Sequence, residues 1–169
     1  GYGRDAHGTH LFKNLYKILL NNENIVKDST NNAKPTQLLQ NITGFSKNII
    51  RDTISKKKIV NYQVTHIFGR TKNPFLFTAP WNIVWKPKIL DPFTGHESKG
   101  ANSLNYKEAF LNKCKLIYSD YINEYNTLAS KYFSKDKIDK ALHQINSDDI
   151  NEKDFKKFKL DVFKELSKI

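Results

Sequence analysis

The side chains that could do chemistry lie in the middle of the chain, in the order histidine, asparagine, acid, histidine: His66, Asn82, Asp91 and His96. Two cationic residues, Arg70 and Lys72, follow the first histidine. Hydrolysis of a phosphodiester needs a base that deprotonates water, a divalent cation that stabilises the developing charge, and positive charge that holds the phosphate. These residue types could supply all three functions.

The local sequence predicts the elements that would position these side chains. Residues 59–68 are rich in β-branched and aromatic side chains and are closed by a glycine, which is typical of a strand. Residues 81–85 form a second apolar run between two prolines, which favours a short strand. The pair Asp91-Pro92 then predicts the start of a short helix through residue 98.

This strand, strand, helix order, with His, Asn and His in sequence, resembles the ββα-metal nucleases of the histidine-asparagine-histidine (HNH) family. The resemblance covers residues 60–99. It implies a metal-dependent endonuclease that hydrolyses DNA phosphodiester bonds, a restriction endonuclease being one form of such an enzyme. It also implies that His66 is the general base and that the side chain of Asn82 orients its imidazole.

The same resemblance implies the remaining roles. Asp91 or His96 would bind a divalent cation, with Mg²⁺ preferred and Mn²⁺ or Zn²⁺ as alternatives, and Arg70 or Lys72 would hold the phosphate. Thr65 stands where family members commonly carry an acid or another histidine, so the residue that replaces this ligand is open.

Each of these residues also has a structural interpretation. A histidine on a strand is often hydrogen-bonded within the fold, and Asn82 could turn the chain. Two other functions therefore compete with the nuclease: a module that binds nucleic acid without cutting it, and a helical interaction domain whose charge is incidental.

The flanking sequence is mainly helical by its apolar spacing. We expect an α+β, mostly helical protein in which a two-stranded antiparallel ribbon and a short helix are embedded among longer helices. It would be one compact domain with an N-terminal helical segment (1–58), a ββα-metal-like core (59–99) and a C-terminal helical segment (100–169). The helices predicted outside the core are 9–21, 36–40, 46–54, 106–132, 135–145 and 148–166.

The charge of the chain points to polyanionic partners. Twenty-eight Lys and Arg residues against 17 Asp and Glu residues give a formal charge of +11 in 169 residues. We expect double-stranded DNA as the partner, contacted by Lys56, Lys57, Lys58 and Lys72. The lysine run has an alternative interpretation as a helix C-terminus, which cations stabilise.

Composition also excludes several classes of protein. The mean hydropathy of −0.62 and the lack of a long apolar run exclude a membrane-spanning protein, and the single cysteine excludes an internal disulfide. We expect a cytoplasmic protein. The chain contains no methionine, which suggests a processed product or a piece of a longer protein. A homodimer would allow both DNA strands to be cut.

Overall fold

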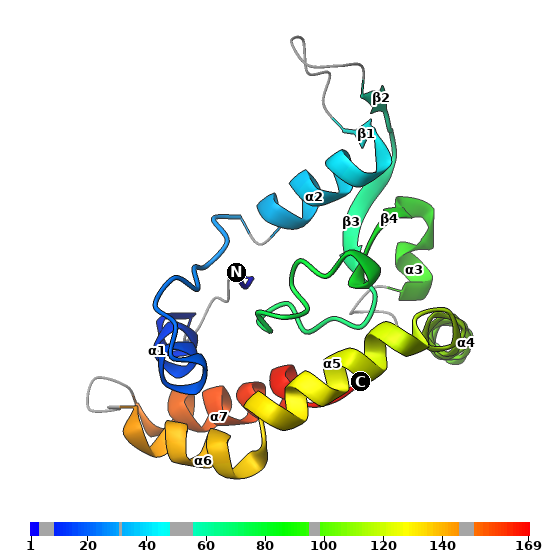
Figure 1. Cartoon of the computed structure of the whole chain (residues 1–169). Helices are drawn as coiled ribbons and strands as arrows, with labels where there is room; N and C mark the ends of the chain where they lie inside the picture. The colour runs from blue at the N-terminus through cyan, green and yellow to red at the C-terminus, as the bar shows by residue number, and fades with distance from the viewer. Residues whose placement is uncertain (4–8, 31, 48–55, 95–98, 146–150) are drawn as a thin grey trace.

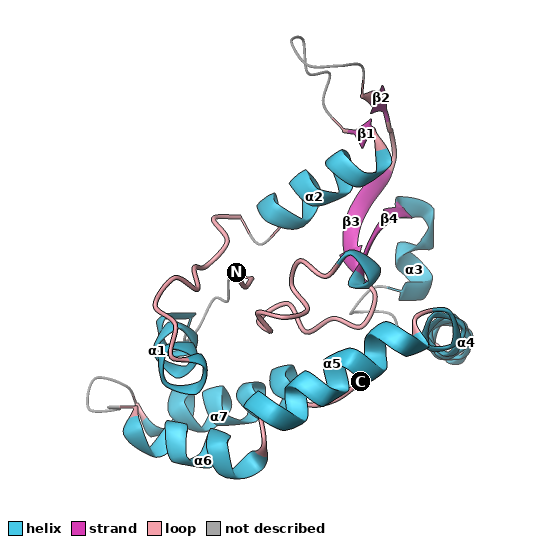
Figure 2. Cartoon of the chain, viewed as in Figure 1, coloured by secondary structure: helices cyan, strands magenta, loops and turns pink. Residues whose placement is uncertain are grey.

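The structure is a computed structural model that describes residues 1–3, 9–30, 32–47, 56–94, 99–145 and 151–169. Helices dominate it, and the largest strand pairing is one antiparallel ribbon (Figure 2). The predicted α+β, mostly helical fold class is therefore confirmed.

One end of the molecule is a group of four helices around the main apolar core: α1 (Thr9–Leu20), α5 (Ser119–Tyr132), α6 (Lys135–Gln144) and α7 (Glu152–Leu166) (Figure 1). Each contributes apolar side chains at helical spacing to a single buried cluster. The helices predicted at 9–21 and 135–145 are confirmed within one residue. The last helix begins at Glu152 rather than 148, and residues 148–150 lie outside the described ranges.

The other end contains the ribbon of β3 (Tyr62–His66) and β4 (Ile83–Pro87), which pair antiparallel with His66 opposite Ile83 and Gln63 opposite Lys86. Side chains alternate between the two faces of a strand. Val64 and Ile83 therefore share one face, where they pack against Leu39 of α2 (Ala33–Thr43). The short helix α3 (Asp91–Thr94) follows β4 through the 3-10 turn η2 (Lys88–Leu90).

The lysine run forms a strand, which corrects its interpretation as a helix end. Lys57–Lys58 is β2, and it pairs in parallel with β1 (Phe45–Ser46). The predicted helix over 46–54 is wrong at Ser46, because Ser46 belongs to strand β1. Residues 48–54 lie outside the described ranges. Helix α2 instead runs as one element and ends at Gly44, whose φ of 70° closes the last turn.

The long helix predicted over 106–132 is two helices, α4 (Ala101–Ile117) and α5, separated at Tyr118. The apolar stripe continues through the break, but its two halves have different partners. Tyr106 of α4 contacts Phe93 of α3, with ring centroids 5.5 Å apart, whereas Ile122 and Tyr125 of α5 are buried. The break at Tyr118 lets α4 and α5 run in different directions, so that α4 reaches α3 while α5 packs in the helical core (Figure 1). Much of the apolar surface of α4 stays exposed, although Cys114 is buried as predicted.

None of the helices in the described part of the chain combines the length and apolarity needed to cross a bilayer.

Candidate active site at the end of strand β3

His66 is the last residue of β3, and its imidazole is held by the loop that follows. Its Nε2 atom lies 2.9 Å from the carbonyl oxygen of Phe77, and its ring stacks on the Phe77 ring with centroids 5.5 Å apart. A carbonyl can only accept a hydrogen bond, so Nε2 carries the proton and the neutral ring has its lone pair on Nδ1. This tautomer has a defined nitrogen that can take a proton.

The surroundings of His66 keep the ring neutral near pH 7. Burial lowers its pKa from the usual 6.5, because a charged imidazolium loses hydration inside the protein. The hydrogen bond to the Phe77 carbonyl opposes this shift but does not cancel it. A neutral, fixed imidazole is the form that a general base requires.

The Asn82 side chain binds the beginning and the middle of the loop between the strands. It is fully buried at the end of the 3-10 turn η1 (Pro80–Asn82), directly before β4. Its Oδ1 accepts the Phe68 N–H at 2.9 Å, and its Nδ2 donates to the carbonyl oxygens of Gly69 at 3.3 Å and Leu76 at 3.0 Å. The prediction that Asn82 orients the imidazole directly is corrected: its contacts fix the loop, and the Phe77 carbonyl of that loop contacts the ring.

Arg70, predicted to hold a phosphate, is engaged by the C-terminal end of α7 in the structure. Its guanidinium donates to the Lys164 carbonyl and to the hydroxyl of Ser167, and reaches the Lys168 carbonyl at 3.1 Å. The last carbonyl groups of a helix lack partners within the helix and carry partial negative charge, which a cation stabilises. The site of this contact is 94 residues away in sequence.

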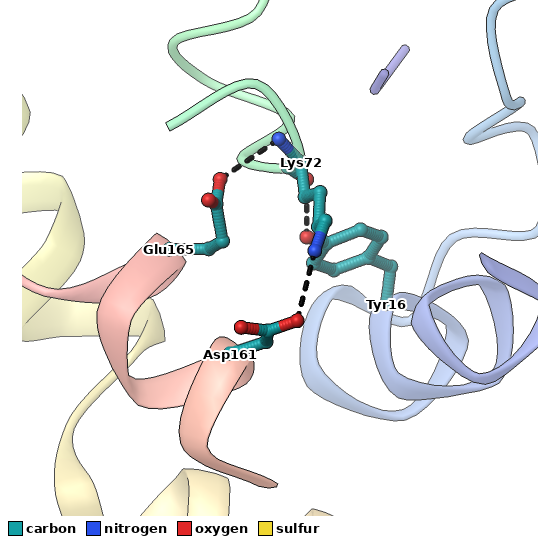
Figure 3. Close-up of polar contacts among 4 residues, drawn as sticks. All are labelled: Tyr16, Lys72, Asp161 and Glu165. Carbon is teal, nitrogen blue, oxygen red and sulfur yellow. Dashed lines mark hydrogen bonds and ion pairs between the residues drawn. The ribbon is translucent and has the colours of Figure 1, made fainter. Parts of the chain in front are cut away.

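Lys72, the other residue predicted to hold a phosphate, is also engaged within the protein. Its ammonium group lies 3.0 Å from Asp161, and its backbone N–H donates to the Glu165 carboxylate at 2.9 Å. Its carbonyl accepts from the Tyr16 hydroxyl (Figure 3). Burial raises the pKa of Glu165, although the nearby Lys72 and Arg70 act in the opposite direction.

Asn73 is a residue that the sequence analysis missed. It is fully buried, and its Nδ2 donates to the Tyr125 hydroxyl and the Glu165 carbonyl, each at 2.9 Å. Its Oδ1 accepts the Phe75 N–H at 2.9 Å. The Asn-Pro pair at 73–74 indicates a turn, but no local pattern reveals that this asparagine is buried against two helices.

Asp91 lies apart from His66. Its Oδ1 is 2.6 Å from the ammonium group of Lys86 and also accepts from the amide of Gln63. These two residues face each other across the ribbon, on the face opposite His66. The structure therefore does not bring Asp91 to the predicted base.

Among the residues that the structure describes, no three His, Cys, Asp or Glu side chains gather as a group that could hold a metal ion. The carboxylate of Asp91 is already paired with a cation. The other predicted ligand, His96, lies outside the described residues.

Three of the four predicted DNA-contacting lysines, residues 56–58, lie at the far end of the ribbon from His66, at strand β2 (Figure 1). Lys57 and Lys58 are exposed on β2. Lys56 is half-buried and donates to the Asn41 side chain of α2 at 3.0 Å. This group of three lysines, residues 56–58, is called the β2 lysine group below.

Comparison with known proteins identifies relatives but no activity. The family model described as "Uncharacterised protein PM1201" matches residues 1–169. The uncharacterised protein PM1201 of Pasteurella multocida (strain Pm70) is 47% identical over 131 residues, which is 78% of this chain and 56% of that protein. The chain thus spans little more than half the length of this relative. No solved structure matches.

Proposed function

Because the chain belongs to the PM1201 family of uncharacterised proteins, we propose its function from the site alone: it is an endonuclease that hydrolyses DNA phosphodiester bonds, with His66 as the general base. Restriction of foreign DNA is one role that such an activity would serve. The proposal goes beyond the family assignment, which names no reaction.

The observation that supports it is the contact between His66 Nε2 and the Phe77 carbonyl at 2.9 Å. A base must present a lone pair in one direction, and a ring held at one nitrogen does so at the other. Burial keeps the ring in its proton-accepting form. In the proposed reaction, Nδ1 of His66 removes a proton from the attacking water, and the resulting hydroxide attacks phosphorus. The bond from phosphorus to the leaving sugar oxygen breaks, and that oxygen takes up a proton from solvent water.

Asn82 supports the proposed role of His66 as the general base by fixing the loop that contacts its ring. Its three side-chain hydrogen bonds hold residues at the beginning and in the middle of the segment that supplies the Phe77 carbonyl. A buried amide whose donors and acceptor are all used has one favoured orientation. Asn82 thus stabilises the loop conformation in which the Phe77 carbonyl contacts the His66 imidazole.

A divalent cation belongs to the proposal through the resemblance to HNH nucleases, because no group of three potential ligands gathers among the described residues. A cation such as Mg²⁺ would stabilise charge on the phosphate. Addition of Mg²⁺, Mn²⁺ or Zn²⁺ to chelator-treated protein tests this part of the proposal separately from the role of His66.

The test is nicking of supercoiled plasmid DNA by wild type, His66→Ala and His66→Gln. The glutamine amide can still donate to the Phe77 carbonyl but cannot act as a base at neutral pH. We expect both variants to lose about 10²- to 10⁴-fold in cleavage rate with nearly unchanged DNA affinity and thermal stability. The matched control is His143→Ala, at an exposed histidine on α6, which should cleave like wild type.

Full cleavage by a well-folded His66→Gln protein would remove His66 from the reaction. The second candidate function is a duplex-binding module without catalysis, and the engagement of Asp91, Arg70 and Lys72 within the protein favours it. That function predicts salt-sensitive DNA binding by wild type but no nicking with any of the three cations.

A further inference from the structure

Asn73 lies between the helical group and the loop that contacts His66. On one side its amide binds the Tyr125 hydroxyl of α5 and the Glu165 carbonyl of α7. On the other side its own carbonyl oxygen accepts the Phe77 N–H at 2.9 Å. Asn73 therefore connects two helices to Phe77, the residue whose carbonyl contacts the imidazole.

The hydrogen bonds of the Asn73 side-chain amide fix its orientation. Both N–H groups of its amide are donated and its Oδ1 accepts the Phe75 N–H. The Tyr125 hydroxyl donates in turn to the Ser167 carbonyl at 2.8 Å, so it presents only an acceptor to Asn73. A residue with this many satisfied contacts at zero exposure is held rigidly.

The same loop is attached to α7 at two neighbouring points. Arg70 binds the carbonyls at the end of α7, and the Lys72 N–H binds the Glu165 carboxylate. Asn73 is the innermost of these attachments, and it also contacts the Phe77 backbone. The position of the Phe77 carbonyl thus depends on α5 and α7 through Asn73.

We propose that Asn73 is a positioning residue for His66: by fixing the Phe77 carbonyl against α5 and α7, it selects the imidazole tautomer that leaves Nδ1 free to accept a proton. The inference rests on the proposed function for its catalytic meaning. Its structural content, the dependence of the His66 tautomer on Asn73, can be measured without any cleavage.

The experiment is NMR titration of the His66 imidazole nitrogens in the full chain. The variants are Asn73→Ser, which removes both helix contacts, and Tyr125→Phe, which removes one of them. In wild type we expect the Nε2–H tautomer and a His66 pKa below 6.5. In Asn73→Ser we expect a mixture of tautomers and a His66 pKa that rises toward 6.5 as water reaches the ring. Tyr125→Phe should give an intermediate change.

The matched control is Asn126→Ser. Asn126 also binds backbone with both ends of its amide, at Ile169, and these side-chain hydrogen bonds go to the C-terminus and not to the described residues of the loop. It should lower thermal stability without changing the His66 tautomer. If Asn73→Ser does not fold, Tyr125→Phe decides, since it removes a hydroxyl at nearly constant shape.

The inference is overturned if folded Asn73→Ser, or folded Tyr125→Phe where the former does not fold, keeps the wild-type tautomer and pKa. It is also overturned if Asn126→Ser changes them equally. Cleavage is measured in parallel, with a loss of about 10- to 100-fold expected for Asn73→Ser. Absence of wild-type cleavage would end the proposed function while leaving the tautomer result intact.

Discussion

His66 and Asp91 lie on opposite faces of one two-stranded ribbon. His66 is paired with Ile83, whose side chain packs toward α2, whereas Asp91 binds Gln63 and Lys86 on the other face. A carboxylate and a base that are to act on one phosphate must approach from the same side. The fold therefore separates His66, the proposed base, from Asp91, although the sequence predicts both in one site.

The first prediction follows from this separation. Asp91→Asn keeps the size of the side chain and removes the charge that pairs with Lys86. Because Asp91 does not reach the His66 face, we expect the cation concentration for half-maximal cleavage to stay within about two-fold of wild type. The free energy of unfolding should fall by at most about 1 kcal/mol, as expected when a partly exposed ion pair is lost. A requirement for much higher cation in plasmid nicking would return Asp91 to a metal site.

The second prediction concerns the pH dependence of cleavage. Burial lowers the pKa of His66, so the protein must be made more acidic than pH 6.5 before the ring is protonated. Rates measured from pH 4.5 to 8 should reach a plateau toward alkaline pH and fall toward acidic pH, with a midpoint below 6.5. A midpoint above 6.5 would contradict a buried neutral base.

The third prediction separates a structural from a phosphate-binding role for Arg70. Arg70→Ala removes the cation from the end of α7 and should destabilise the protein by about 1–2 kcal/mol. The slope of log affinity for DNA against log salt should not change, because no phosphate contact is lost. Denaturant unfolding and fluorescence anisotropy measure the two effects. A flatter salt slope with unchanged stability would restore the phosphate role.

The fourth prediction concerns Glu165, whose pKa is raised by burial from the usual 4.5. As pH rises above 4.5, the unfolded chain ionises at this group before the folded protein does, so folding stability decreases until the folded pKa is passed. Glu165→Gln keeps an oxygen that can accept the Lys72 N–H but cannot ionise. Its melting temperature relative to wild type should therefore rise between pH 4 and pH 7. If the difference in melting temperature between Glu165→Gln and wild type does not change with pH, burial does not raise the pKa of Glu165.

The fifth prediction concerns the β2 lysine group. Replacement of Lys56, Lys57 and Lys58 together by alanine should make the salt slope of DNA binding less steep by about 2 to 3, since each lost phosphate contact accounts for about 0.9. The control removes three exposed lysines of α7, Lys153, Lys156 and Lys157, for the same change in net charge. Equal effects in the two variants would mean that net charge, and not the β2 lysine group, governs binding.

The sequence alone determined the elements whose periodicity is local. Amphipathic spacing predicts α1 and α6 within one residue, since each helix must bury one stripe against its neighbours. Strand composition and flanking prolines predict the ribbon over 59–68 and 81–85. In the structure its strands are shifted to Tyr62–His66 and Ile83–Pro87, so that Asn82 precedes the second strand and does not lie within it. Both signals depend on residues close together in the chain.

The tertiary structure alone decided the partners of the polar side chains. Arg70 meets α7 from 94 residues away, and the amide of buried Asn73 meets Tyr125 from 52 residues away. The ribbon register places Asp91 on the face away from His66, because a strand alternates its side chains at every residue. Such contacts depend on how whole elements pack. A cation near a candidate base therefore looks the same in sequence whether it binds a phosphate or the end of a helix.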